Sequence, residues 1–312
     1  MAVETFHTLI ARNKRNSFLL IGIFLAFFIG FGLLIGMVWG AGDWRFAWVV
    51  AAAAAMLAFL LTLGSFYGGS SVLLSMSRAK EIRKADDPQL FNVVEELCLA
   101  GGAPMPRIYL IDDSAMNAFA TGRNPAHSAV AITTGLRAKL TRDELQGVIA
   151  HELSHVRHYD ILYATLVAVM VGTLVILSDV FLRSLWYGGG SRRRRSSRSE
   201  GGGAAQVILL VLGILLAILA PILARIIQMA LSRQREYLAD AGAVELTRNP
   251  EGLAGALAKL AGDQEVLEVA NRATAPLYIV HPIKKFEARA NSIFNTHPPV
   301  QDRIERLLSL GR

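Results

Sequence analysis

The sequence predicts a mainly α-helical membrane protein in which four hydrophobic helices carry an α+β domain with a small β-sheet. The first observation is composition: the chain of 312 residues is 53% hydrophobic and 18% charged, whereas soluble domains carry about 25% charged residues. The second is that the apolar residues gather in long runs. The third is that two other stretches have the mixed composition of a soluble domain, and the first of them contains the sequence HELSH.

Four apolar runs define the expected membrane segments. The runs at 17–39 and 46–67 are each long enough to cross the roughly 30 Å hydrocarbon core of a bilayer, and a short turn joins them. We therefore expect residues 1–76 to form a transmembrane hairpin. A second hydrophobic hairpin is expected over 161–231, from the runs at 161–182 and 204–227, with a linker rich in Arg, Gly and Ser at 187–203.

The two mixed blocks, residues 77–160 and 232–312, are together long enough to form one packed domain. In the first block we expect a helix over 87–99 and strands over 107–111 and 129–133. Thr141 and Glu144 have the spacing of a capping box, in which each residue satisfies a free amide at the start of a helix. That start places HELSH well inside a helix. The second block is expected to be helical, with breaks near 249–250 and over 296–299.

Positive charge orients the first hairpin. Arg12, Lys14 and Arg15 precede the first run and another basic group follows the second, whereas the turn between them offers only Arg45. Basic residues in short loops mark the cytoplasmic side of a membrane. The N-terminus and the first block are therefore expected in the cytoplasm. Two crossings by the second hairpin, or none, return the second block to the same side.

The linker at 187–203 opposes the simplest version of this topology. Its five arginines supply most of the net charge of +7, and two full crossings would place them outside. The alternative is a second hairpin that lies in or against the interface, with the linker inside, where arginines can contact anionic lipids. Because the basic charge is so local, it does not indicate nucleic acid binding. The lipid bilayer is the expected non-protein partner.

The HELSH sequence carries the strongest indication of chemistry. His151 and His155 lie four residues apart, so on a helix both imidazoles reach a single ion. Glu152 points beside that ion, as in the H-E-x-x-H signature of zinc metalloproteases. A catalytic zinc usually takes three protein ligands, and Glu236 is the best candidate for the third. Asp240 lies one turn further on, where it can accept a hydrogen bond from a ligand histidine; the alternative is that both acids are solvated.

Further groups of residues, in the same order along the chain, carry a resemblance to a known family. They are HELSH at 151–155, Ser232-Arg233 with Glu236-Tyr237 and Ala239-Asp240, Asn117 to Ala120, and residues 296–299 followed by Arg303. The chain resembles the HtpX heat-shock protease family of membrane metallopeptidases, which is related to the CAAX prenyl endopeptidases. The resemblance covers nearly the whole chain and implies a zincin-like (gluzincin) metallopeptidase domain in the cytoplasm, with one Zn²⁺ per subunit.

The resemblance also implies roles for residues outside the metal site. It assigns an edge strand beside the cleft, where an extended substrate pairs through its backbone, to Asn117, Ala118, Phe119 and Ala120. It makes His297 the donor that stabilises the oxyanion; the alternative is a loop histidine held between prolines. For Arg303 a structural role and a functional role both remain open.

The expected function is that of a membrane-bound zinc endopeptidase in the bacterial inner membrane, with Glu152 as the general base for a zinc-activated water. The polypeptide substrates, misfolded or damaged membrane proteins, are implied by the resemblance alone. If the helix of HELSH continues into the apolar run at 161–182, the zinc lies near the cytoplasmic membrane face. A non-proteolytic protein with zinc as a structural prop is the rival interpretation, but structural zinc normally has four protein ligands. Nothing in the sequence indicates an oligomeric state.

Overall fold

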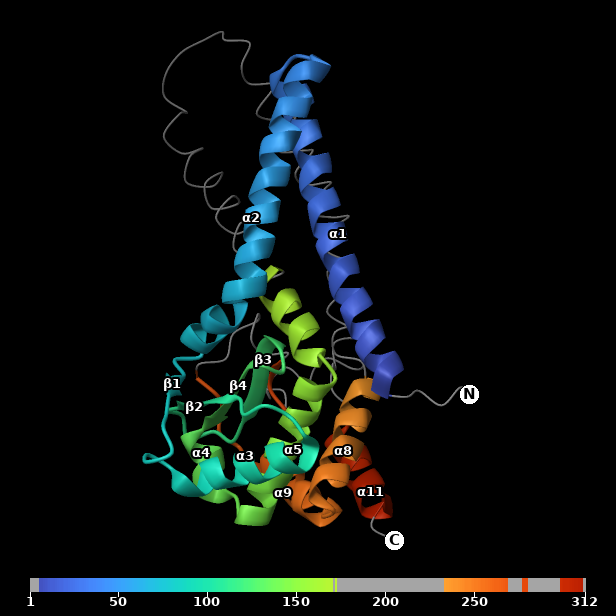
Figure 1. Ribbon diagram of the computed structural model, residues 1–312. Coiled ribbons are helices and arrows are strands. Elements are labelled where there is room, and N and C mark those ends of the chain that lie inside the picture. Colours follow the sequence, from blue (N-terminus) through green and yellow to red (C-terminus); the bar gives the residue numbers. More distant parts are fainter. Residues whose placement is uncertain (1–5, 171, 173–232, 269–276, 280–297, 311–312) are drawn as a thin grey trace.

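The computed structural model shows a long helical hairpin that projects from a base of packed helices and strands (Figure 1). The structure describes residues 6–170, 172, 233–268, 277–279 and 298–310. Half of the apolar run at 161–182 and all of the run at 204–227 lie outside these residues, as do the linker at 187–203 and His297. In the described part the chain is mainly helical, with a small mixed sheet, as the sequence predicts.

The hairpin consists of α1 (Phe6–Trp39) and α2 (Trp44–Met76), which are long and apolar enough to cross a membrane. The turn between them ends at Asp43, whose side chain accepts a hydrogen bond from the Arg45 N–H at 2.8 Å. With 34 and 33 residues, each helix is about 50 Å long at 1.5 Å per residue. Both therefore exceed the roughly 30 Å hydrocarbon core, and their lower ends extend into the base.

Small residues bring the two hairpin helices together. Gly32, Gly36 and Gly40 recur every fourth residue of the chain, and the first two meet Ala51 and Ala47 of α2. A Cβ atom added to Gly32 would lie only 2.7 Å from the Ala51 Cα atom. Such close backbone approach between small residues is typical of helix pairs in membranes. The glycine spacing is visible in the sequence, but the sequence analysis did not use it.

The sheet in the base has four strands in the order β1-β2-β4-β3. The strands are β1 (Lys80–Glu81), β2 (Arg107–Ile111), β3 (Ala118–Asn124) and β4 (His127–Thr133). β2 and β4 are parallel, and the other two pairs are antiparallel. The strand expected over 107–111 is confirmed, and that over 129–133 is the second part of β4. β3 lies at one edge, where the family resemblance placed the strand that begins near Asn117.

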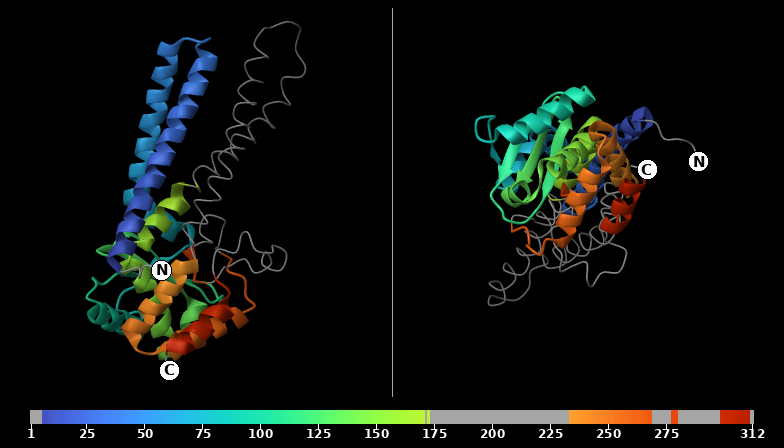
Figure 2. Two further views of the ribbon diagram at one scale, coloured as in Figure 1. Left: turned by 90° about the vertical axis from the view of Figure 1, so that its right-hand side faces the viewer. Right: turned by 90° about the horizontal axis from the view of Figure 1, so that it is seen from below.

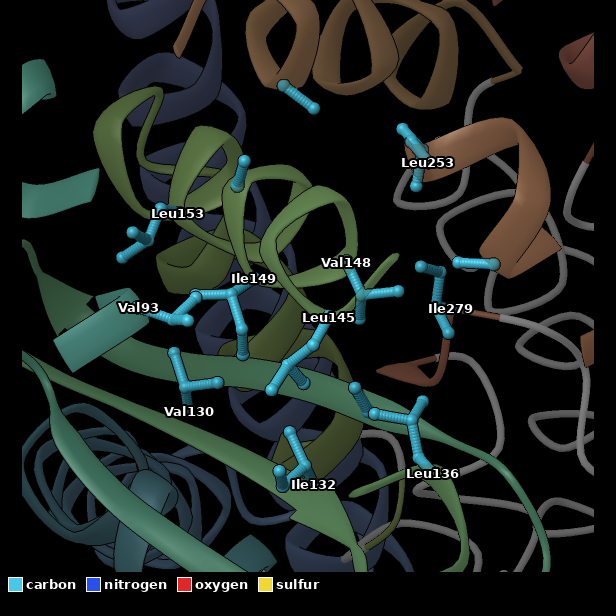
Figure 3. Packing of buried hydrophobic residues seen from close by; sticks show 14 of the residues in the cluster. Val93, Val130, Ile132, Leu136, Leu145, Val148, Ile149, Leu153, Leu253 and Ile279 are labelled. Atoms are coloured by element: carbon cyan, nitrogen blue, oxygen red, sulfur yellow. The ribbon is translucent and has the colours of Figure 1, made fainter. Parts of the chain in front are cut away.

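Side chains alternate between the two faces of the sheet. On one face, Val130 and Ile132 of β4 pack against Leu145 and Ile149 in a core cluster to which α3, α5, α9 and α11 contribute (Figure 3). The other face, with Phe119 among others, packs against residues that include Leu74 at the lower end of α2. The hairpin is thus anchored directly on the sheet of the base rather than joined to it by a free linker.

Four helices of the base, those after Asp87, Thr141, Asn249 and the break at 296–299, begin where the sequence predicts, whereas the short helix after Thr133 was not expected. They are α3 (Pro88–Gly101), α4 (Thr134–Lys139), α5 (Arg142–Arg157), α8 (Arg233–Thr247), α9 (Pro250–Gly262) and α11 (Val300–Leu310). α5 starts with the expected capping box: the Thr141 N–H donates to the Glu144 carboxylate, and the Glu144 N–H donates to the Thr141 hydroxyl. Asn249 caps α9 by accepting a hydrogen bond from the Gly252 N–H at 3.1 Å.

The condition that the helix of HELSH continues into the apolar run at 161–182 is not met. α5 does not continue into the apolar run at 161–182, because it ends at Arg157, and a separate helix spans Asp160–Met170. Between them Tyr159 adopts a left-handed backbone conformation, with φ of +61°. The break is held by α1, since the Asn13 side chain donates to the His158 carbonyl at 2.9 Å. The partners lie 145 residues apart, so no local pattern could show this contact.

Candidate metal centre

The two histidines of α5 lie side by side in the base. Their ring centroids are 4.8 Å apart and the ring planes are nearly perpendicular, at 88°. His151 is buried and His155 is partly buried. Both imidazoles therefore face the same side of α5, as the sequence predicts from their spacing of four residues on a capped helix.

α8 packs against α5 and brings Glu236 to the two histidines. The Nε2 atoms of His151 and His155 each lie 3.7 Å from a carboxylate oxygen of Glu236. One ligand atom from each of the three residues lies within 4.8 Å of the others. Two imidazole nitrogens and one carboxylate oxygen are the donor set of many catalytic zinc sites. The three residues that the sequence singles out thus fit a zinc ion by their chemistry and their proximity.

Asp240 contacts the ring nitrogen of His151 that faces away from Glu236. Its carboxylate lies 3.0 Å from Nδ1 of His151 and receives two hydrogen bonds from the guanidinium of Arg303, at 2.9 and 2.7 Å. Burial alone would raise the pKa of Asp240, but the charge of Arg303 and the hydrogen bond with His151 lower it below its usual range. Asp240 therefore stays ionised. Arg303, left open by the sequence analysis, is completely buried in the site, with 1% of its surface exposed.

A second carboxylate, Asp160, supports His155, and the sequence analysis missed it. Its Oδ2 atom lies 3.0 Å from Nδ1 of His155. Five residues along a continuous α-helix, Asp160 would point roughly 140° away from His155. The periodicity therefore argued against this pair, and only the break at Tyr159 turns the carboxylate back toward the imidazole.

Glu152 faces the edge strand β3. Its carboxylate is buried, and the backbone N–H of Ala120 lies near enough to lower its pKa. Burial raises the pKa of Glu152 to about 7; the neighbouring His155 acts in the opposite direction, and the charge of Glu236 acts in the same direction. A carboxyl group with a pKa near neutrality is suited to accept and return a proton.

Residues 117–120 flank this site, but hydrogen bonds within the chain already occupy some backbone groups at this edge of the sheet. The Asn117 side chain accepts a hydrogen bond from the Ala118 N–H at 3.0 Å, and the Ala118 carbonyl accepts one from the Ile279 N–H, also at 3.0 Å. The Phe119 ring meets Tyr278 edge to face, with centroids 5.2 Å apart. Pairing of a substrate with the strand at Ala118 would require the hydrogen bond from Ile279 to be exchanged.

Comparison with known proteins places the chain in a family. The sequence profile of peptidase family M48 matches residues 84–310, which include the residues of the candidate metal centre described above. The chain belongs to peptidase family M48. It is therefore a metallopeptidase, and the zinc that the family implies fits the donor set of His151, His155 and Glu236.

Within the family the chain is similar to HtpX proteases over almost its whole length. It is 43% identical to the protease HtpX homolog of Lactobacillus acidophilus over 300 residues, which cover 96% of this chain and 97% of that protein. The corresponding protein of Dictyoglomus turgidum is 42% identical over 313 residues, with 98% and 95% covered. The crystal structure of S. mikatae Ste24p is 19% identical with a TM-score of 0.49; the similarity covers 93% of this chain but only 65% of that one.

Proposed function

We propose that this enzyme is a membrane-bound zinc endopeptidase that cleaves misfolded or damaged membrane proteins at the cytoplasmic face of the bacterial inner membrane. The observation that carries the proposal is the cluster of His151, His155 and Glu236 at the foot of the apolar hairpin, with Glu152 beside it. The nature of the substrates is taken from the similarity to HtpX proteases.

Each residue of the cluster has a distinct proposed role. His151, His155 and Glu236 would hold one Zn²⁺ per subunit, and Asp240 would keep the His151 ring in one orientation. When bound, the zinc would lower the pKa of a water molecule to about 7 and polarise the scissile carbonyl. Glu152 takes the proton of the attacking water and later delivers it to the leaving amine. The Ala120 N–H, which lowers the pKa of Glu152, favours the ionised carboxylate that accepts this proton.

Residues outside this cluster complete the proposed machinery. His297, which precedes the described segment 298–310, is proposed to stabilise the oxyanion, on the strength of the family resemblance. The edge strand with Asn117, Ala118, Phe119 and Ala120 is proposed to guide an extended substrate toward Glu152. Both proposals are supported by neighbours that do lie in the site: Arg303 in the helix that follows His297, and Ala120 in contact with Glu152.

The proposed architecture follows from the apolar runs. The segments 1–76 and 161–231 hold the protein in the membrane, whereas 77–160 and 232–312 form the catalytic part. The basic residues in the lower end of α1 support a cytoplasmic position for that end. Because α1 and α2 are longer than the hydrocarbon core, the metal centre at their foot lies outside it. Cleavage of membrane-near cytoplasmic segments follows from this placement.

The test compares the parent protein with Glu152→Gln in detergent, using an unfolded polypeptide as substrate. The parent is expected to lose hydrolysis with a chelator and regain it with zinc. Glu152→Gln is expected to keep its zinc and lose hydrolysis by at least about 100-fold, the scale of general-base catalysis. Near-parental hydrolysis by the zinc-loaded variant would remove Glu152 from the mechanism, and a parent that binds no zinc would refute the proposed function itself.

A further inference from the structure

A polar side chain of the first membrane helix reaches the metal centre. Asn13 lies near the lower end of α1 with 2% of its surface exposed. Its amide nitrogen donates to the His158 carbonyl at 2.9 Å and to the Oδ1 atom of Asp160 at 2.6 Å. Both neighbours are acceptors, so the amide NH₂ group and not its oxygen must face them. The figures show the lower end of α1 next to α8 and close to the end of α5 (Figure 2).

Asp160 connects this amide to a proposed zinc ligand. Its Oδ2 atom lies 3.0 Å from Nδ1 of His155, while Oδ1 faces Asn13 and the guanidinium of Arg235, which lies 3.5 Å away. Asp160 itself is buried, with 7% of its surface exposed. A buried carboxylate needs hydrogen bonds to both of its oxygens. Of the two contacts to Oδ1, the hydrogen bond from Asn13 is the shorter. Asn13 thereby fixes the orientation in which Oδ2 meets His155.

The same turn of α1 also holds the backbone that presents Asp160. Besides the bond from Asn13 to the His158 carbonyl, the Lys14 ammonium lies 4.3 Å from the centre of the Tyr159 ring. Tyr159 is the residue whose left-handed conformation separates α5 from the next helix. A non-glycine residue in this conformation costs of order 1 kcal/mol or more and persists only when its surroundings hold it. Here α1 provides those surroundings.

We propose that Asn13 is a positioning residue of the metal centre: through Asp160 it orients the His155 ring, so that the seating of the membrane helix α1 sets the affinity for zinc. The inference rests on the proposed function in one respect, because it takes His155 as a zinc ligand. It adds a role for the hairpin, which then is part of the metal site and not only an anchor. Partners that orient ligand histidines are commonly worth 10- to 100-fold in metal affinity or activity.

The first experiment replaces Asn13 by leucine, which has nearly the same shape and no hydrogen-bond donor. The full-length protein in detergent is titrated with zinc against a chromophoric chelator, and the visible absorption spectrum of the Co²⁺-loaded form is recorded. Asn13→Leu is expected to bind zinc about 10-fold or more weakly and to change the Co²⁺ spectrum. The matched control is Ser17→Ala, which removes the buried hydrogen bond of 2.9 Å from the Ser17 hydroxyl to the Asn13 backbone carbonyl but leaves the Asn13 amide group and Asp160 unchanged. It should leave both readouts at the parental values.

A second variant covers the case in which Asn13→Leu does not fold. Asn13→Asp is close in size but places a carboxylate against Asp160, and it is expected to weaken zinc binding more than leucine does. Parental zinc affinity in either folded variant overturns the proposal, as does an equal loss in Ser17→Ala, which would indicate general destabilisation. If the proposed function is wrong, the parent protein itself is expected to bind no zinc, which distinguishes this outcome from a failure of the inference about Asn13.

Discussion

The Oδ1 atom of Asp240 lies 3.0 Å from Nδ1 of His151, and Arg303 donates to the same oxygen at 2.7 Å. Asp240 thus orients an imidazole whose other nitrogen faces Glu236. Asp240→Asn keeps the size of the side chain but loses its charge, so we expect zinc affinity to fall about 10- to 100-fold. Zinc titration against a chelator measures this, with the exposed Asp302→Asn on α11 as the control. Parental affinity in Asp240→Asn would show that His151 does not depend on this carboxylate.

Replacement of Arg303 is expected to reduce the stability of the fold in the first place, and the chemistry of the site only second. Arg303→Met leaves the buried carboxylate of Asp240 without its guanidinium partner, which typically destabilises a protein by about 3–5 kcal/mol. Thermal unfolding in detergent should show a large decrease, compared with a small one for the exposed Arg306→Met. Adding Asp240→Asn to Arg303→Met should recover part of the loss, because the unpaired charge is removed. A double variant as unstable as the sum of the two changes would contradict this explanation.

The third ligand can be tested by comparing alanine variants. Glu236→Ala is expected to lower zinc occupancy as severely as His155→Ala, because each removes one of three ligands. Metal analysis of the purified proteins gives the occupancy. Glu245→Ala, on the same helix α8 but at the surface, should retain full occupancy. If Glu236→Ala also retained it, the third ligand would have to be sought elsewhere in the chain.

The close contact within the hairpin predicts a position-specific effect. Gly36→Leu places a side chain against the backbone of Ala47, so the two helices must separate and the unfolding temperature in detergent should fall. Gly30 provides the matched control, since a Cβ atom there meets nothing within 4 Å. Gly30→Leu should unfold at the parental temperature. Equal decreases in both variants would mean that helix packing at Gly36 is not the cause.

The orientation of the hairpin can be read by cysteine labelling. In a Cys98→Ala background, Gly42→Cys places a thiol in the turn between α1 and α2, and Ala85→Cys places one in an exposed loop of the base. A membrane-impermeant thiol reagent is expected to label Gly42→Cys in intact cells and Ala85→Cys only after lysis. The reverse pattern would put the metal centre outside the cell. The same reagent on a Gly189→Cys variant tests on which side the arginine-rich linker lies.

Local signals in the sequence were sufficient for much of the fold. The capping box at Thr141, the break near 249–250 and the strands over 107–111 and 129–133 depend on signals over a few residues, and each is confirmed. Glu236 could be predicted because a catalytic zinc needs a third protein ligand, which limited the candidate residues. The resemblance located β3, which composition alone did not mark.

The support of His155 could not be predicted in this way. Asp160 meets the imidazole because the chain breaks at Tyr159, and the side chain that bonds to Asp160 at this break is Asn13, which lies 147 residues earlier. Helical periodicity describes neighbours on one helix and carries no information about a partner from another. The glycine spacing of α1, in contrast, could have been used to predict the packing of α1 against α2, because small residues at this spacing are typical of helix pairs in membranes.

The distance along the chain between the parts of the metal centre has a consequence in time. Arg303 follows His151 by 152 residues, and chains grow at about 5–20 residues per second. Roughly 8–30 s of synthesis therefore separate the HELSH helix from the guanidinium that holds Asp240 behind His151. During that interval the nascent chain has its two histidines and Glu152 but no completed site. Long after the first hairpin and the HELSH helix have been synthesised, the nascent chain therefore still lacks the guanidinium that pairs with Asp240.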